Sequence, residues 1–164
     1  MARFARISPC LWFDGKAVEA AEFYVSLFEN SRIDHVMHGP TDWPGGKAGE
    51  PLFVAFTLAG QAMQALNGGP YTEFTNAVSL SVACADQAEV DRLWTALTAD
   101  GGEEVQCGWL RDRFGLSWQI VPEVFFDMLR ANDPDRAARF MAEVVKMVKL
   151  DVATLERAYR GDTG

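Results

Sequence analysis

The chain of 164 residues is 49% hydrophobic and 23% charged, values typical of a globular protein with one sizeable core. Its formal net charge of -8, without any run of Lys and Arg, argues against the basic face that nucleic-acid binding requires. No stretch approaches the ~20 apolar residues of a membrane span, and the N-terminus lacks the pattern of a secretory leader. We therefore expect a cytoplasmic protein without a nucleic-acid or membrane partner.

The cysteine pattern points to a reducing compartment. The three cysteines, Cys10, Cys84 and Cys107, are odd in number and widely spaced, with no CxxC pair. This spacing fits neither a disulfide framework nor a zinc site. A buried free cysteine usually behaves as a small core residue, and we expect this of Cys10 and Cys84, which lie in apolar runs.

The first half of the chain begins with an alternating pattern. It predicts a strand over Arg6–Phe13, with Ser8, Cys10 and Trp12 on the parity opposite the apolar residues. Asp14 then stands where a helix cap is expected, before an apolar stripe of helical period. The first strand and helix are thus predicted to pack against each other.

Three further strands complete this half. The pattern predicts strands over Ser31–His38, Pro51–Leu58 and Ala62–Leu66, the last two joined in a hairpin. The Gly- and Pro-rich segment Gly39–Glu50 is expected to be an exposed loop.

The same order of elements recurs about 72 residues later, which suggests a tandem duplication. A strand over Ala77–Cys84 leads to a helix that Asp86 caps, with Glu89 placed as in a capping box. Short strands are expected within Glu103–Arg113 and Leu116–Val121. The identity between the halves is poor, and only the order of elements and the Asp caps recur.

After Pro122 the pattern becomes helical. Residues Phe125 to Leu129 suggest a short helix, Pro134 stands at a favoured first-turn position, and Asp151 caps a third helix. Apolar stripes of this kind are usually core or a subunit interface, and not a cofactor site. We expect a helical tail over residues 123–160.

Five stretches together resemble the PhnB-like family. They run in that family's order from Ile7 to Tyr159, and the fourth is long and specific. The stretches are ISPCLWFDGKAVEAAEFYVSLF, GQAMQALNGGP, DQAEVDRLW, CGWLRDRFGLSWQIVP and KMVKLDVATLERAY. The family belongs to the vicinal oxygen chelate superfamily, with glyoxalase I, extradiol dioxygenases and the bleomycin resistance proteins.

The resemblance implies an α+β fold of tandem βαβββ modules that form curved sheets around a cavity, with extra C-terminal helices. The modules correspond to residues of about 6–70 and 77–122, within a single domain of 1–164. The resemblance also implies a homodimer. Each strand is expected to turn its apolar side to the helix and its Ser or Cys side to the cavity.

In metal-using members of the superfamily, His, Glu or Gln side chains hold one divalent ion. The resemblance places those positions near Ser8, Gln64, Ser79 and Gln119. This set supplies no anionic or imidazole ligand, so we expect no metal and no other cofactor. His35 and His38, at i and i+3 on a strand, are expected to point to opposite faces and not to share an ion.

The resemblance also selects residues for a ligand cavity, without assigning a catalytic one. Hydrogen bonds among themselves or to buried water are an equal alternative for the polar members, and plain core packing is one for the tryptophans. The run WLRDRFG is expected to form ion pairs at a hairpin turn. The ligand-cavity candidates are Ser8, Trp12, Gln64, Asn67, Ser79, Trp109 and Gln119.

Three functions compete. The missing metal ligands favour a metal-independent protein that binds an unidentified small molecule in its cavity. The fold alone favours a metal-dependent enzyme of the glyoxalase or dioxygenase type. Relatives often carry a demethylubiquinone methyltransferase label, but the Gly pairs of this chain follow no strand of the kind that methyltransferases use, so we give that activity no weight.

Overall fold

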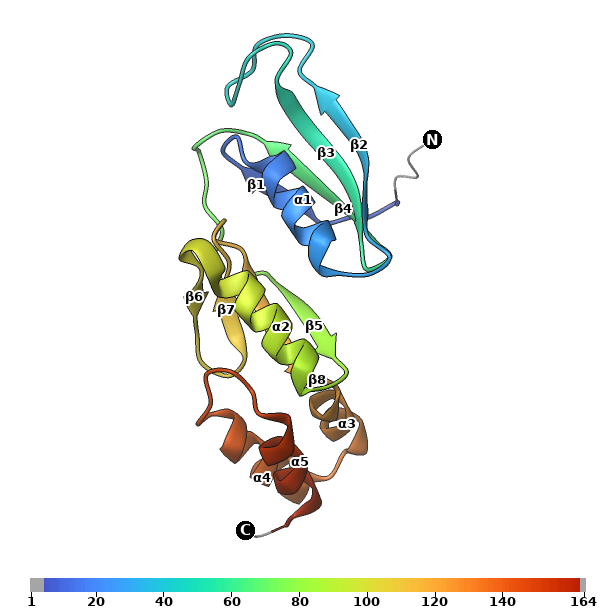
Figure 1. The fold of residues 1–164 in the computed structure, drawn as a ribbon, viewed down its shortest axis with the longest axis vertical. Coiled ribbons are helices and arrows are strands. Elements are labelled where there is room, and N and C mark those ends of the chain that lie inside the picture. The colour runs from blue at the N-terminus through green and yellow to red at the C-terminus, as the bar shows by residue number, and fades with distance from the viewer. Residues whose placement is uncertain (1–4, 163–164) are drawn as a thin grey trace. The chain divides into compact units, whose positions relative to one another are not determined.

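The computed structural model describes residues 5–162 and divides into two compact units, one ending at Phe74 and the other beginning at Thr75. Figure 1 shows the fold of each unit. Both units contain a strand, a helix and three further strands in that order, and a helical tail follows in the second. The expected α+β fold with tandem βαβββ modules is therefore confirmed.

The first unit is a four-stranded mixed sheet with one helix on it (Figure 1). The sheet has the order β1-β4-β3-β2, in which β1 runs parallel to β4 and the other neighbours are antiparallel. The elements are β1 (Cys10–Phe13), α1 (Ala17–Leu27), β2 (Arg32–His38), β3 (Pro51–Leu58) and β4 (Gln61–Asn67).

The core of this unit lies between α1 and the sheet. On β1 and β4 alternate residues are buried because successive side chains point to opposite faces, whereas β3, inside the sheet, buries Val54 to Leu58 without interruption. Three alanines on the buried face of α1 leave room for the helix to lie close to the strands. The core residues of the two layers are Leu11, Phe13, Ala17, Ala20, Ala21, Tyr24, Val54, Phe56, Met63 and Ala65.

The first strand is shorter than predicted. It begins at Cys10 and not at Arg6, and Ile7 is 85% exposed. Pro9 stands directly before the strand, and proline has no N–H to donate to a ladder. Ser8 therefore lies outside β1, before its first residue.

The N-terminus of α1 is capped from a distance. Asp14 is not the cap, because the helix begins at Ala17 and no side chain near its start bonds to it. Instead, Asn67 Oδ1 accepts a 2.8 Å hydrogen bond from the N–H of Ala17, and Asn67 Nδ2 donates to the carbonyl of Pro51 at 2.8 Å. Asn67 thus joins β4 to both α1 and β3.

The segment of residues 39–50 is a loop, as predicted, but it is closed on itself. Trp43 and Gly46 exchange backbone hydrogen bonds of 3.0 and 3.1 Å, and Trp43 Nε1 donates to the carbonyl of Asn67 at 2.7 Å. A Cβ on Gly45 would lie 2.5 Å from the backbone of residues 68 and 69. Only glycine permits this close approach of the loop to the end of β4.

The second unit has the same arrangement. Its sheet has the order β5-β8-β7-β6, again with one parallel pair, β5 and β8, and α2 packs on it (Figure 1). The elements are β5 (Ser79–Cys84), α2 (Gln87–Thr98), a 3-10 turn (Ala99–Gly101), β6 (Glu103–Glu104), β7 (Trp109–Arg111) and β8 (Ser117–Pro122).

The predicted cap of α2 by Asp86 is confirmed, whereas the Glu89 side chain bonds to the residue before the cap and not to the cap itself. Asp86 Oδ1 accepts a 2.9 Å hydrogen bond from the N–H of Glu89, and the Glu89 carboxylate accepts one of 2.9 Å from the N–H of Ala85.

The strand before α2 is shorter than predicted. It begins at Ser79 and not at Ala77, and Val78, which stands before it, is 70% exposed.

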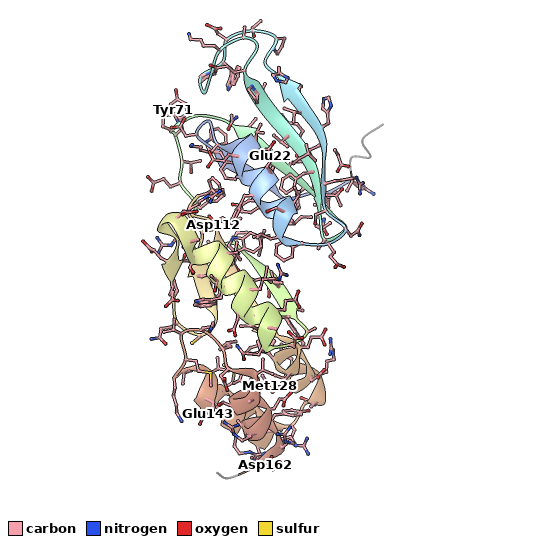
Figure 2. The ribbon with its side chains drawn as sticks, in the orientation of Figure 1. Glu22, Tyr71, Asp112, Met128, Glu143 and Asp162 are labelled. Carbon is pink, nitrogen blue, oxygen red and sulfur yellow. The ribbon has the colours of Figure 1, made fainter. Side chains whose placement is uncertain are left out.

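The tail consists of α3 (Glu123–Ala131), α4 (Pro134–Val144) and α5 (Val152–Arg160). Pro134 occupies the first turn of α4, and Asp151 caps α5 by accepting from the N–H of Thr154 at 2.7 Å, as predicted. The helices enclose a small core of their own, near the Met128 label in Figure 2. Its buried members are Met128, Phe140, Val144, Leu150 and Leu155.

Residues of the tail form hydrogen bonds and an ion pair with α2. The Gln87 side chain donates to the carbonyl of Leu150 at 3.4 Å and accepts from the N–H of Val152 at 2.8 Å. Lys149 Nζ lies 2.6 Å from the Asp91 carboxylate, whose pKa this hydrogen bond lowers. In residues 5–162, no helix has the length and apolar character that crossing a membrane requires.

Candidate functional site

In the first unit, the sheet face opposite α1 carries Gln64. Gln64 pairs with Cys10 on one side and with Ala55 on the other, and Ala55 pairs with His35. Paired residues of neighbouring strands share a face, and these residues have the parity opposite the buried core. The alternation expected for Gln64 is therefore observed.

Trp12 lies on the same face as Cys10 but is held by the backbone. Its Nε1 donates to the carbonyl of Gly69 at 2.8 Å, and a Cβ on Gly68 would lie 2.2 Å from its ring. The ring is thus fixed over the chain that leaves β4. Asn67 has the parity of the core, so the structure does not bring it to the face that carries Gln64.

In the second unit, the face opposite α2 carries the remaining candidates. Gln119 pairs with Ser81 on β5 and with Trp109 on β7. Gln119 Nε2 donates to Ser79 Oγ at 2.9 Å, which joins two predicted candidates directly. Trp118, at the opposite parity, is 1% exposed and faces α2, as its position predicts.

The two units repeat one local arrangement. In each, a glutamine on the last strand stands beside a small residue on the parallel first strand, Gln64 beside Cys10 and Gln119 beside Ser81. The positions facing the two glutamines are thus Cys10 and Ser81, two residues after Ser8 and Ser79. The parallel pairing of β1 with β4 and of β5 with β8 sets this register.

These residues do not fit a divalent metal ion. Amide and hydroxyl groups are weak ligands without a carboxylate or imidazole to accompany them. The Cys10 thiol beside Gln64 is a single strong ligand, and one such ligand does not make a metal site. Within residues 5–162 no three His, Cys, Asp or Glu side chains lie together as a metal site would need.

The two histidines of β2 do not change this result. Two β-bulges interrupt β2, between Ile33 and His35 and between Met37 and His38, so the strict alternation that was expected to separate the histidines does not hold. Both histidines are exposed. His35 shares its row with Gln64, but Ala55 stands between them, which sets the two strands about 10 Å apart.

Asp112 is a central residue that the sequence pattern did not reveal. It is 3% exposed, and it accepts from the N–H groups of Phe114 and Leu116 at 2.8 and 3.1 Å and from Trp118 Nε1 at 2.8 Å. Figure 2 labels it in the second unit. Of the predicted ion pairs, Arg113 meets Asp100 at 3.1 Å. The run thus builds a turn around a buried carboxylate.

The tail has shallow hollows of its own. One of about 310 Å³ lies beside α3 and α5, with Glu123, Tyr159 and Arg160 in its lining. Arg160 already meets Glu156 at 3.6 Å and Asp162 at 2.9 Å. No residue selected from the sequence lines this hollow, so it does not extend the candidate site.

The comparisons agree with this architecture. The family model described as 3-demethylubiquinone-9 3-methyltransferase matches residues 5–121, whereas α3, α4 and α5 lie beyond the match. The resemblance therefore covers less of the chain than the expected range from Ile7 to Tyr159. No curated protein matches the chain.

Two solved structures show the same fold. A PhnB protein from Bacillus cereus is 34% identical, with a TM-score of 0.65, over 72% of this chain and 99% of its own. Protein PA1353 from Pseudomonas aeruginosa is 23% identical, with a TM-score of 0.56, over 70% of this chain and 95% of its own. The chain therefore belongs to the PhnB-like family whose model matches it.

Proposed function

We propose that this PhnB-like protein binds a small organic molecule without the help of a metal ion. The ligand would contact the sheet face opposite α2, where Gln119 offers an amide group. The face opposite α1, with Gln64, offers a polar surface of the same kind in its own unit. Trp109, on the same face as Gln119, offers an aromatic wall. Pockets for small molecules commonly combine such a wall with a few polar groups.

The observation that carries the proposal is the repeated pairing of a glutamine with a small neutral residue. Cys10 and Ser81 supply a thiol and a hydroxyl, and the glutamines supply one donor and one acceptor function each. Such groups orient a ligand through hydrogen bonds. They lack the charge that would fix a divalent ion during catalysis.

A metal-dependent reaction of the glyoxalase or dioxygenase type is the alternative. It requires at least three strong ligands around one ion, and the chemistry of the groups beside Gln64 and Gln119 opposes it. The alternative predicts that ligand binding or turnover depends on added metal, and this dependence separates the two functions experimentally.

The test is a fragment screen by ligand-observed NMR, with protein treated with EDTA and with protein supplied with zinc or manganese. We expect the same compounds to bind in both conditions. Gln119→Ala should weaken binding about 2–10-fold, the effect of one hydrogen bond. Gln61→Ala, at the exposed start of β4, is the matched control and should leave binding unchanged. Binding only in the presence of metal would support the enzyme.

The methyltransferase activity in the family's description is not part of this proposal. Methyltransferases of the common type use a doubly wound parallel sheet with a Gly-rich loop after the first strand. Both sheets here are mixed and have four strands. We expect no heat of S-adenosylmethionine binding in calorimetry, and measurable binding would reinstate that activity.

A further inference from the structure

The face opposite α2 carries a positive charge among its polar groups. Ser79 pairs with Ser117 and Ser117 with Arg111, so these residues form one row across β5, β8 and β7. The neighbouring row holds Gln119 and Trp109. Because paired residues share a face, the guanidinium of Arg111 belongs to the same surface as the candidate amide and indole.

The guanidinium of Arg111 has unused donors. Its Nη1 lies 3.4 Å from a Glu103 carboxylate oxygen, and the Glu103 side chain is 62% exposed, so this is a weak surface pair. Its Nε is shielded from solvent and has no hydrogen-bond partner among the described residues. A shielded donor without an acceptor is costly, so a rotation of the Arg111 side chain that brings Nε to an incoming acceptor is favoured.

The other groups of the face are arranged around this charge. Ser117 Oγ donates to Asn76 Oδ1 at 2.9 Å, and the Gln119 amide is bonded to Ser79. These bonds fix the neutral groups but leave the arginine side chain, 42% exposed, accessible to a ligand. An acceptor that approaches this face therefore meets a fixed polar surface with one cation.

We propose that this face binds the carboxylate of a small aromatic or other planar organic acid, with Arg111 as the anchor. The planar guanidinium of a partly exposed arginine donates two parallel hydrogen bonds to a carboxylate. Trp109, two residues away on the same strand, offers its ring to the body of the ligand. The inference rests on the proposed binding function and adds the charge class of the ligand.

The test compares acids with their neutral amides. ¹⁵N-labelled protein is titrated with benzoate, phenylacetate and 3-phenylpropionate, and separately with the three corresponding amides. The readouts are the Arg111 Nε–H and Trp109 indole resonances. We expect at least one acid to shift both resonances saturably, and its amide to bind about 10-fold more weakly, the effect of a charged hydrogen-bonded pair.

Variants assign the effect to Arg111. R111Q should weaken acid binding about 10-fold. R111K keeps the charge but cannot donate two parallel hydrogen bonds, so its affinity for the acid should lie between those of R111Q and the native protein. R92Q removes the same charge from α2, on the other side of the sheet, and should leave the affinity unchanged. If the spectrum of R111Q shows that this variant does not fold, R111K tests the role of Arg111 in its place.

The outcomes separate the two proposals. Equal binding of acids and amides, or acid binding that R111Q and R111K leave unchanged, would overturn the anionic class while leaving small-molecule binding intact. If neither series shifts the two resonances but neutral fragments from the screen do, the anionic class is again overturned, and small-molecule binding is retained. If nothing binds in either experiment, both proposals fail.

Discussion

At the residue scale, Asp112 shows how one buried carboxylate organises a turn. Three N–H donors, two from the backbone and one from Trp118, surround its oxygens. A charge is expensive to bury, but hydrogen bonds to the ionised form compensate for the lost water. The turn between β7 and β8, and hence the positions of Arg111 and Gln119 on either side of it, depends on this group.

Asp112→Ala should lower the free energy of unfolding by about 3 kcal/mol, because the replacement leaves buried donors without an acceptor. Urea unfolding followed by circular dichroism measures the change. Asp100→Asn removes a carboxylate that is 75% exposed and paired with Arg113, keeps a residue type that tolerates the positive φ of 56° at this position, and should have little effect. Equal stabilities of the two variants would contradict the assigned role of Asp112.

The cysteines should differ in reactivity. Burial, and then the nearby Glu89 carboxylate, raise the pKa of Cys84 from 9.0 to about 12. Its reactive thiolate is therefore absent from the folded protein near neutral pH. We expect iodoacetamide at pH 8 to label Cys10, which is exposed, and to spare Cys84 until urea unfolds the chain. Peptide mass spectrometry reads the sites, and early labelling of Cys84 would contradict its burial.

The same shift predicts a pH dependence of stability. Because the folded-state pKa of Cys84 is raised, its contribution is complete below pH 9.0, the ordinary value of the unfolded chain. Above that pH the unfolded chain ionises while the folded one does not, so the contribution is lost progressively towards pH 12. Cys84→Ser should reduce this alkaline loss, measured as the change in urea midpoint between pH 8 and pH 10.

At the element scale, α1 depends on a residue far away in sequence. The helix has no local side-chain cap, and Asn67 at the end of β4 supplies the acceptor for its first N–H. The same amide satisfies a carbonyl of β3. This single side chain therefore couples the helix to the sheet on which it packs.

Asn67→Ala should destabilise the protein by about 1–2 kcal/mol through the lost cap. Asn67→Asp keeps the acceptor and should recover part of that loss. Asp14→Ala, at the position where the sequence predicts the cap, should leave the urea midpoint unchanged. A larger effect at Asp14 than at Asn67 would show that the capping interaction is local after all.

Most helices and strands can be predicted from the sequence, but the residues at which they begin and end cannot. The apolar run Pro51–Leu58 and the Asp86 cap predict β3 and α2 correctly, because both signals are local. The cap of α1 and the environment of Asp112 depend on contacts with distant residues, which a local pattern does not contain. The register that places Cys10 beside Gln64 is likewise set by the parallel partner strand.

At the scale of the whole molecule, the family resemblance leads us to expect a homodimer. The tail adds apolar surface that its own core does not use, since Leu129 is 60% and Val145 is 59% exposed. Single exposed apolar residues are ordinary on a protein surface, so the expectation of a dimer rests on the family resemblance. Light scattering should give twice the 18.1 kDa mass of one chain, and the mass of a single chain across the accessible concentrations would contradict the dimer.

The proposed binding function requires no bound metal ion. The neutral pairs Cys10–Gln64 and Ser81–Gln119 supply hydrogen bonds where metal-using relatives would need charged or imidazole ligands. The most direct measurement is the metal content of untagged protein by plasma mass spectrometry. We predict less than about a tenth of an equivalent per chain, unchanged after soaking with zinc or manganese, whereas about one equivalent, as a dedicated site holds, would contradict the account.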